Sequence, residues 1–341
     1  MRTFPFKKAL WFLLKLAFLV GIFWYLLHSE MLHLELLLRL AQKPAAVLGQ
    51  LVLLFGLLYF PVFLRLKVLL EAADYRMSFG SAVWIGWISL FFSTFLPGTV
   101  TADAIKIYLV LRENPGRSIA PMLAVMTVDH VFALVIAILI SAVAVASNLD
   151  FFGQDPTLTL LAQAVVLLFV GLAVVWILLS IPFKKQDPVL WILGKLPATG
   201  GLSSVYLTFR QLAKNRRAMA KSLLLSSVSS LGLLCSYGLL IEFIGLSQPH
   251  TGTLLWVISL ADLSTAVPIG PSGLGVGHVT FEYFFQLAGL QGGADTFNLH
   301  TILRLIVCFF GAVPYLLYRR SAGLAGELPA LSPTQTDSQL P

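Results

Sequence analysis

Long apolar runs separated by short polar segments follow one another along almost the entire chain. A transmembrane helix needs about 17 to 25 consecutive, mostly apolar residues to cross the hydrocarbon core of a bilayer. Six runs meet this requirement, and the pattern therefore predicts six membrane-spanning helices. These runs are residues 10–27, 46–64, 119–146, 158–183, 223–246 and 299–318.

Two further apolar segments carry helix-breaking residues near their middle. Residues 79–111 are interrupted at Pro97-Gly98, and residues 258–282 contain Pro268, Pro271 and four closely spaced glycines. Proline removes a backbone donor and glycine permits positive φ, so neither segment can continue as one helix. Irregular backbone survives at membrane depth only where protein buries it or where it lines a wet cavity. We therefore expect two re-entrant hairpins, each made of two short helices.

The elements follow the same order in both halves of the chain, namely span, span, hairpin and span. Residues 10–147 would form one repeat and residues 157–320 a second, within a single transmembrane domain that covers residues 1–320. Because the second repeat starts from the opposite face, the architecture is an inverted repeat of six spans and two hairpins. After it, residues 321–341 are expected to form a disordered cytoplasmic tail.

Positive charge indicates which loops face the cytoplasm. The segment 184–221 holds eight Lys or Arg and only one acidic residue, Asp187, whereas loops 147–157 and 247–252 hold no Lys or Arg. Arg65, Lys67 and Arg76 close the span at 46–64. This distribution predicts that both termini are cytoplasmic, and that a short surface helix at 203–220 carries basic side chains.

Composition agrees with this pattern. Hydrophobic residues make up 58% of the chain, charged residues make up 11%, and the mean hydropathy is +0.87. These values predict an all-α polytopic membrane protein. The net charge of +7 is concentrated in residues 184–221, so this segment is expected to contact anionic lipid headgroups. Nucleic-acid binding is not expected, because it would require a soluble module with interleaved aromatic residues.

Ionisable side chains inside apolar segments are candidate functional residues, because each costs at least ~2.5–3.5 kcal/mol to insert into a membrane. Asp103 and Lys106 lie three residues apart and can form a local ion pair, and His278 and Glu282 lie four apart and can share a helix face. The candidate substrate-binding residues are Asp103, Lys106, Asp129, His130, Gly273, Gly275, His278, Glu282 and Arg304.

Two interpretations of Asp129 and Arg304 remain open. They can pair with each other as a buried link between the two halves, or they can line a polar path for a lipid headgroup. His278 and Glu282 supply only two of the three or four ligands that an enclosed metal site needs, so we expect neither metal nor cofactor. The backbone N–H groups of the stretch GPSGLGVG, before the second helix of its hairpin, can attract a phosphate.

At these residues the sequence resembles the lysylphosphatidylglycerol-synthase transmembrane region, a family of flippase-like membrane proteins. The resemblance runs over residues 10–320, through LPGTVTADAIK, then VDH, then PIGPSGLGVGH, then a late LR. It departs from the family pattern at six positions. Thr101-Ala102 replaces the glycine pair that precedes Asp103 in the family pattern. Lys106, His130 and Gly277 occupy positions where the family has Arg, and His278 occupies a position where it has Glu.

The resemblance implies a translocator of phospholipid or polyprenyl-phosphate-linked lipid, with Pro97, Gly98, Asp103, Asp129, Pro268, Gly273, Gly275 and Arg304 carried over from the pattern. It implies no enzymatic activity for this chain, because only about 20 residues follow Arg320 and they leave no room for a transferase domain. Two alternatives stay open, namely a non-transporting scaffold for an envelope-biogenesis enzyme and an intramembrane headgroup enzyme with His278 as base. A homo-oligomer or a membrane-enzyme partner is also compatible with the sequence.

Overall fold

The computed structural model describes residues 35, 38, 40, 42–95, 99–180, 187–195, 200–245, 250–265 and 275–321, and within them every regular element is a helix. The predicted span at 10–27 and all of the predicted tail at 321–341 except Ser321 lie outside these residues. Five helical segments are long and apolar enough to cross a membrane, which confirms an all-α polytopic membrane fold. They are Pro44–Ala72, Ile119–Ala146, Pro156–Ile177, Arg216–Phe243 and Gly293–Leu317.

The first of these segments is one helix with a wider turn in its middle. It consists of α3 (Pro44–Leu53), the π-helical turn η1 (Leu54–Tyr59) and α4 (Phe60–Ala72). Pro61 has no N–H, so the carbonyl group four residues earlier loses its usual partner, and a π turn directly before the proline accommodates this loss. The helix extends beyond the predicted end at 64, because Lys67 and Glu71 continue it as an exposed ion pair one turn apart.

Helix α12 (Arg216–Ile244) packs along this first helix through a row of small residues. The hydroxyl of Ser229 donates to the Leu58 carbonyl (2.8 Å), inside the π turn, and Gln50 donates to Ser236. Between them, Gly232 lies so close to the backbone of Leu57 that a Cβ atom would stand 2.8 Å from the Leu57 carbonyl carbon. Small residues at intervals of three or four let two membrane helices approach closely.

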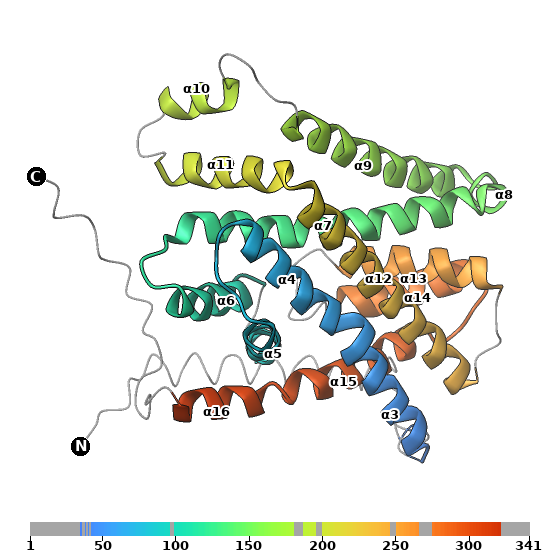
Figure 1. Ribbon diagram of the computed structural model, residues 1–341. Coiled ribbons are helices and arrows are strands. Elements are labelled where there is room, and N and C mark those ends of the chain that lie inside the picture. The colour runs from blue at the N-terminus through green and yellow to red at the C-terminus, as the bar shows by residue number, and fades with distance from the viewer. Residues whose placement is uncertain are drawn as a thin grey trace, which may run out of the picture.

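Both predicted interruptions separate two shorter helices. Helices α5 (Phe79–Phe95) and α6 (Thr99–Glu113) flank the first, and α13 (Thr251–Thr265) and α14 (Val276–Leu287) flank the second. Each has 17 residues or fewer, too few to cross the bilayer at full thickness. In Figure 1, α13 and α14 lie alongside each other, whereas α5 is seen end-on and therefore crosses the direction of α7 and α15.

Helix α7 (Ile119–Ala146) connects the two halves of the protein. Its first half, including Met122 and Phe132, packs in an apolar cluster with residues of α4 to α6 and α11. Its second half, including Ala144 and Val145, packs with residues of α12 to α15. After α7, the short α8 (Leu149–Phe152) leads to α9 (Pro156–Ser180), which returns beside it. The last helices of the described residues are α15 (Gly293–Phe309) and α16 (Ala312–Ser321).

The basic segment forms α10 (Pro188–Lys195) and α11 (Gly200–Lys214), which lie above the left-hand end of α7 in Figure 1. The predicted surface helix at 203–220 is therefore wrong at its C-terminal end. Asn215 is the reason, because its side chain accepts a hydrogen bond from the N–H of Ala218 and starts a new helix, α12.

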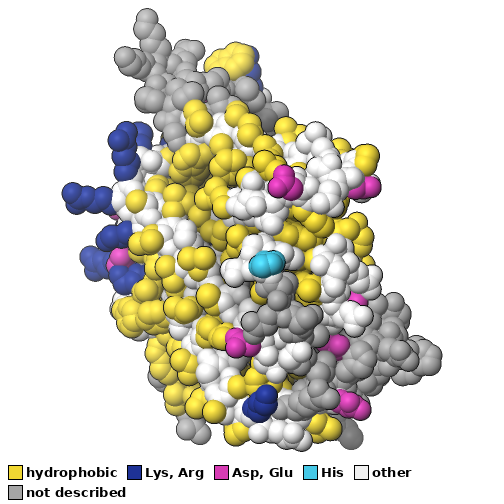
Figure 2. Space-filling view, turned by 90° about the vertical axis from the view of Figure 1, so that its right-hand side faces the viewer, with side chains coloured by type: hydrophobic (Ala, Val, Ile, Leu, Met, Phe, Trp, Pro, Cys, Tyr) yellow, Lys and Arg dark blue, Asp and Glu magenta, His cyan; other side chains and the backbone are white. Residues whose placement is uncertain are grey.

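Apolar side chains dominate the surface shown in Figure 2, and most of the Lys and Arg visible there gather along one edge. Of the five described spans, α9 is the most exposed, because only 11% of its most apolar 18-residue stretch is buried. Its Leu160 and Leu167 side chains are 65% and 72% exposed. Exposed apolar surface of this extent is expected of helices that face acyl chains.

The Gly232 contact predicts a stability difference within α12. Gly232→Ala should destabilise the protein by about 1–3 kcal/mol, because the added methyl group meets the Leu57 backbone, which cannot move aside. Gly238→Ala is the matched control, since nothing lies within 4 Å of its Cβ position. We expect thermal unfolding in detergent to show a lower Tm for Gly232→Ala and an unchanged or slightly raised Tm for Gly238→Ala. Equal melting temperatures would contradict this packing.

The distribution of Lys and Arg among the loops predicts which side of the membrane each loop faces, and cysteine labelling can test this. Single cysteines replacing Gln154 or His250 should react with a membrane-impermeant maleimide in cells whose outer envelope is permeabilised while the membrane that holds the protein stays intact. Cysteines replacing Glu113 or Lys214 should react only after the membrane is permeabilised, because Lys and Arg flank these positions. All four positions are exposed, so exposure alone cannot separate them. Labelling of the Lys214 position from outside would contradict the predicted orientation.

Candidate functional site

Arg65 and Asp129 form an ion pair in the interior of the helix bundle. The Arg65 Nε donates to the Asp129 carboxylate at 2.6 Å, and both side chains are only 4% exposed. The second arm of the guanidinium donates to the hydroxyl of Ser226 at 2.7 Å. The three residues come from α4, α7 and α12, so one buried charge pair joins three membrane spans.

Asp103 lies beside this pair and carries two partners of its own. Lys106 approaches one carboxylate oxygen at 3.2 Å, which confirms the local ion pair predicted from their spacing. His130 Nε2 lies 2.7 Å from the other oxygen. Lys106 and His130 also act electrostatically on Asp129. Asp103, Lys106, Asp129 and His130 therefore form one polar network with Arg65, which we call the first cluster.

The first cluster is not sealed inside the protein. The His130 side chain is 48% exposed, whereas that of Asp103 is 16% exposed. Asp103 is the fifth residue of α6, directly after the first interruption, and His130 lies about 16 Å along α7 from its start. The network therefore reaches from the buried Arg65 to a half-exposed imidazole near the middle of the bundle.

His278 and Glu282 share one face of α14, as their four-residue spacing predicted, and this face contacts α15. His278 Nδ1 accepts a hydrogen bond from the Gly275 N–H (3.3 Å), which completes the cap of α14, and its Nε2 is bonded to the side chain of Asn298. Because Nδ1 accepts, Nε2 carries the proton and donates. Glu282 accepts from the N–H of Ala294, in the first turn of α15 (3.0 Å). Both side chains thus fasten α14 to α15.

The structure describes some of the glycines of the second interruption and not others. Gly273 lies outside the described residues, and Gly275 adopts a φ of 91° as the residue that starts α14. Gly277 is in contact with a neighbouring ring, because a Cβ atom at this position would lie 2.1 Å from Phe297. The Arg that the family pattern has at this position cannot fit here.

Arg304 belongs to a second cluster, which consists of Tyr59, Tyr237, Asp262, His300, Arg304 and Cys308. The electrostatic neighbours of the Arg304 guanidinium are Tyr59, Tyr237, Asp262 and Cys308. His300 lies one turn before Arg304 on α15 and stacks on Tyr237, with ring centroids 4.0 Å apart. Sequence reasoning missed both tyrosines and His300 as members of this cluster, because nothing in a single sequence distinguishes them from ordinary core residues.

Of the two interpretations left open for Asp129 and Arg304, the structure does not show a pair between them, because Asp129 is bonded to Arg65. Arg65 marks the end of an apolar run, and the sequence pattern placed it among the charges that close a span. The helix continues past it, however, and turns its side chain inward. Arg65 and Tyr59 lie on the same continuous helix, about 9 Å apart along its axis, so this helix connects the two clusters.

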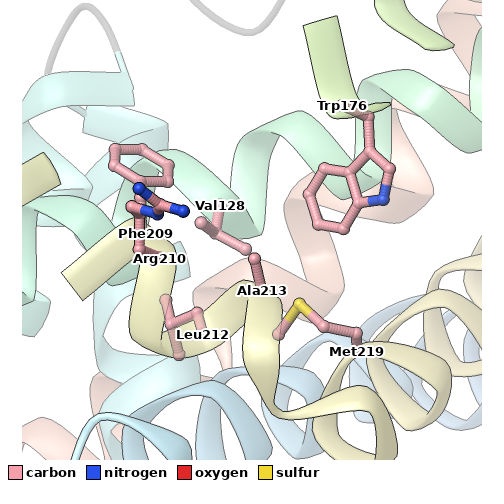
Figure 3. Close-up of a pocket in the computed structure, with 7 residues that line it drawn as sticks. All are labelled: Val128, Trp176, Phe209, Arg210, Leu212, Ala213 and Met219. Atoms are coloured by element: carbon pink, nitrogen blue, oxygen red, sulfur yellow. The ribbon is translucent and has the colours of Figure 1, made fainter. Parts of the chain in front are cut away.

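The pocket in Figure 3 lies between α7, α9, α11 and α12. Its volume is about 10 Å³, room for about one water molecule, so it cannot hold a headgroup. At its edge, Arg210 and Tyr206 bind Asp187, the residue before α10. Burial opposes ionisation of Asp187, but the hydrogen bonds from Tyr206 and Arg210 outweigh it and hold the pKa of this carboxyl below its usual value. The pocket is lined by Val128, Trp176, Phe209, Arg210, Leu212, Ala213 and Met219.

No group of three or more His, Cys, Asp or Glu within the described residues could hold a metal ion. Among these residues the two clusters are instead mixtures of cations, carboxylates and aromatic hydroxyls. Such mixtures are suited to bind a charged organic group rather than a metal, which prefers several anionic or neutral ligands around one point.

The buried ion pair predicts strongly non-additive mutations. Arg65→Ala should destabilise the protein by about 3–5 kcal/mol, because it leaves the Asp129 carboxylate buried without its main partner. The double variant Arg65→Ala with Asp129→Ala should recover much of this loss, since no charge is then stranded. Lys67→Ala, two residues away in an exposed ion pair, is the control and should change stability by less than about 1 kcal/mol.

Thermal unfolding of the wild type, Arg65→Ala, Asp129→Ala and the double variant in one detergent measures the coupling between the two residues. If the double variant loses as much stability as the two single variants together, the interaction between Arg65 and Asp129 contributes nothing to stability.

The comparisons with known proteins identify the family. The sequence profile described as "Lysylphosphatidylglycerol synthase TM region" matches residues 12–316. Comparison with curated proteins and with solved structures gives no match. The matched range includes four of the five described spans in full and the fifth up to residue 316, together with both interruptions and both clusters, in agreement with the resemblance of their motifs. The chain therefore belongs to the lysylphosphatidylglycerol synthase transmembrane-region family.

Proposed function

We propose that this protein moves a phospholipid or a polyprenyl-phosphate-linked lipid between the leaflets of the bacterial inner membrane, with both termini in the cytoplasm. The proposal includes no chemical reaction. The family description names the membrane region of a lysylphosphatidylglycerol synthase, which supports lipid as the substrate class. Any net movement would draw on a gradient or on mass action.

The observation that carries the proposal is that charged side chains lie beside both helix interruptions at membrane depth. Asp103 follows the first interruption by five residues, and Asp262 precedes the second by four. Each charge costs several kcal/mol to hold in a membrane, and proteins retain such residues mainly along substrate or ion pathways. Charges at the ends of broken helices are the arrangement in which membrane transporters bind polar substrates near the midplane.

The exposure of the first cluster supports movement of a substrate rather than simple attachment of helices. A purely structural ion pair is best buried completely, as Arg65 and Asp129 are, because water and lipid both weaken or disrupt it. Asp103 instead pairs with a histidine that is 48% exposed. A polar network that begins deep in the bundle and ends at its surface can receive a headgroup that enters from the side.

A scaffold function is a second candidate, supported by the exposed basic residues where α11 meets α12. Lys214, Arg216, Arg217 and Lys221 are all exposed there, and such a surface suits an acidic partner or anionic lipids. The headgroup enzyme has the least support. Its candidate base, His278, uses one ring nitrogen as the cap of α14 and the other on Asn298.

Arg304 separates these functions. In vesicles containing purified protein, the rate at which a tail-labelled phospholipid exchanges between leaflets should fall to the protein-free rate for Arg304→Ala. Arg304→Lys should recover only a small part, because a guanidinium binds two phosphate oxygens in a fixed geometry and an ammonium does not. Accessibility of the label to a reductant that cannot cross the membrane measures this exchange.

Arg112→Ala is the matched control, since it removes an exposed arginine at the end of α6. Full activity of Arg304→Ala would eliminate Arg304 as a headgroup ligand. If instead the combined neutralisation of Lys214, Arg216 and Arg217 abolishes growth complementation while leaflet exchange is unaffected, the scaffold function replaces the translocator.

A further inference from the structure

The first cluster contains a side chain whose charge changes near neutral pH. Arg65 and Lys106 contribute positive charges. Asp103 and Asp129 contribute negative charges, so these four groups cancel. The fifth member is His130, and an unperturbed histidine gains or loses its charge between about pH 5 and pH 8. The cluster is therefore neutral when the His130 ring is neutral, and it carries a net positive charge when the ring is protonated.

The contacts of His130 determine which ring atom takes the proton. Its Nε2 lies 2.7 Å from the Asp103 carboxylate. An ionised carboxylate only accepts hydrogen bonds, so Nε2 carries a hydrogen in both charge states and Nδ1 is the atom that titrates. The His130 side chain is 48% exposed, whereas those of Arg65 and Asp129 are 4% exposed. His130 is thus the member of the cluster through which a proton from solution enters and leaves.

The charges around His130 come from several helices and oppose one another. On α6, Asp103 favours the protonated ring and Lys106 disfavours it. On α7 itself, Asp129 is paired with Arg65 of α4. Helix α9, which also packs against α7, has no ionisable side chain. Because the nearest charges balance, an additional charge beside the cluster decides the protonation state of His130. Further helices packed against α7 are α8, α11, α12 and α13, and their charged residues are Asp150, Arg210, Lys214, Arg216, Arg217, Lys221, Glu242 and Asp262.

We propose that the first cluster binds an anionic phosphodiester headgroup together with one proton, which His130 takes up. This inference rests on the proposed lipid translocation and names the ion that accompanies the lipid. An anion that binds the neutral cluster would leave a net negative charge beside two carboxylates, and an uncompensated charge is costly at membrane depth. A proton on Nδ1 of His130 cancels that charge.

The two groups that flank Asp103 provide donors for the anion. Lys106 has three N–H donors and lies 3.2 Å from one Asp103 oxygen, and protonated His130 has a donor at Nδ1 that the neutral ring lacks. Phosphate oxygens accept strong hydrogen bonds from such cationic donors. By thermodynamic linkage, the anion and the proton each bind more tightly when the other is present. A zwitterionic headgroup adds no net charge and therefore requires no proton.

Calorimetry measures this linkage without requiring transport. Short-chain phosphatidylglycerol, whose phosphodiester stays singly charged, is titrated into the detergent-solubilised protein at about pH 7, near the midpoint of an ordinary histidine. Repeating the titration in buffers of different ionisation enthalpy gives the number of protons taken up. Wild-type protein should take up as much as about one proton per bound lipid, and it should bind at least about fivefold more tightly at about pH 6 than at about pH 8.

Three variants assign the proton to its residue. His130→Gln is neutral at every pH, so it should take up no proton and bind weakly throughout. His130→Arg stays charged, so it should bind tightly at both pH values, again without proton uptake. His250→Gln, which removes an exposed histidine just before α13, is the matched control and should behave like the wild type.

Three results would overturn the inference. One is the absence of proton uptake by the wild type, or an uptake that His130→Gln retains. Another is the same uptake on binding short-chain phosphatidylcholine, because this lipid adds no net charge. The third concerns dimethyl phosphate, an anionic diester without acyl chains. If it binds as tightly as phosphatidylglycerol, the cluster is a site for a soluble anion and not for a lipid.

Leaflet exchange of tail-labelled phosphatidylglycerol in phosphatidylcholine vesicles separates this inference from the proposed function. Exchange by wild-type protein should be at least about fivefold faster at about pH 6 than at about pH 8, and His130→Arg should remove this difference. If the wild type binds the lipid with a proton but accelerates exchange at neither pH, translocation fails and the proton-linked site stands. If exchange is fast and independent of pH, the inference fails and the translocator stands.

Discussion

The ion pair between Arg65 and Asp129 is the interaction on which the arrangement of the spans depends. Apolar helices have little hydrophobic reason to associate in a lipid bilayer, because acyl chains solvate them equally well. A buried charge, in contrast, must find its partner. Arg65 meets this requirement with Asp129 on α7 and with Ser226 on α12, and three long helices are thereby fixed in one relative position. The small-residue contact between α12 and η1 then follows along the same pair of helices.

The apolar runs predicted five described spans and both interruptions because the physical requirement is local. A span must be long and apolar, and a break needs proline or glycine, so both can be seen in a short stretch of sequence. The helix ends were less predictable. Charged residues such as Lys67 and Glu71 continue the helix beyond the apolar run, and Asn215 divides one basic stretch into two helices.

Partners across helices were the part that the sequence did not reveal. The spacing of four between His278 and Glu282 correctly placed them on one face, but it could not show that this face meets α15 and serves to hold it. Similarly, Asp103 and Lys106 were recognisable as a pair because they lie on one helix. The partner of Asp129 lies 64 positions earlier, and only packing determines which helices are neighbours.

The contact of Gly277 with Phe297 has a consequence for how this protein can change. Because the ring occupies the space that any side chain at position 277 would need, an arginine there requires a smaller residue at 297 first, or at the same time. The two positions are therefore epistatic, and a single reversion toward the family pattern passes through a poorly packed intermediate. We therefore expect relatives that carry the arginine to have a smaller side chain opposite it.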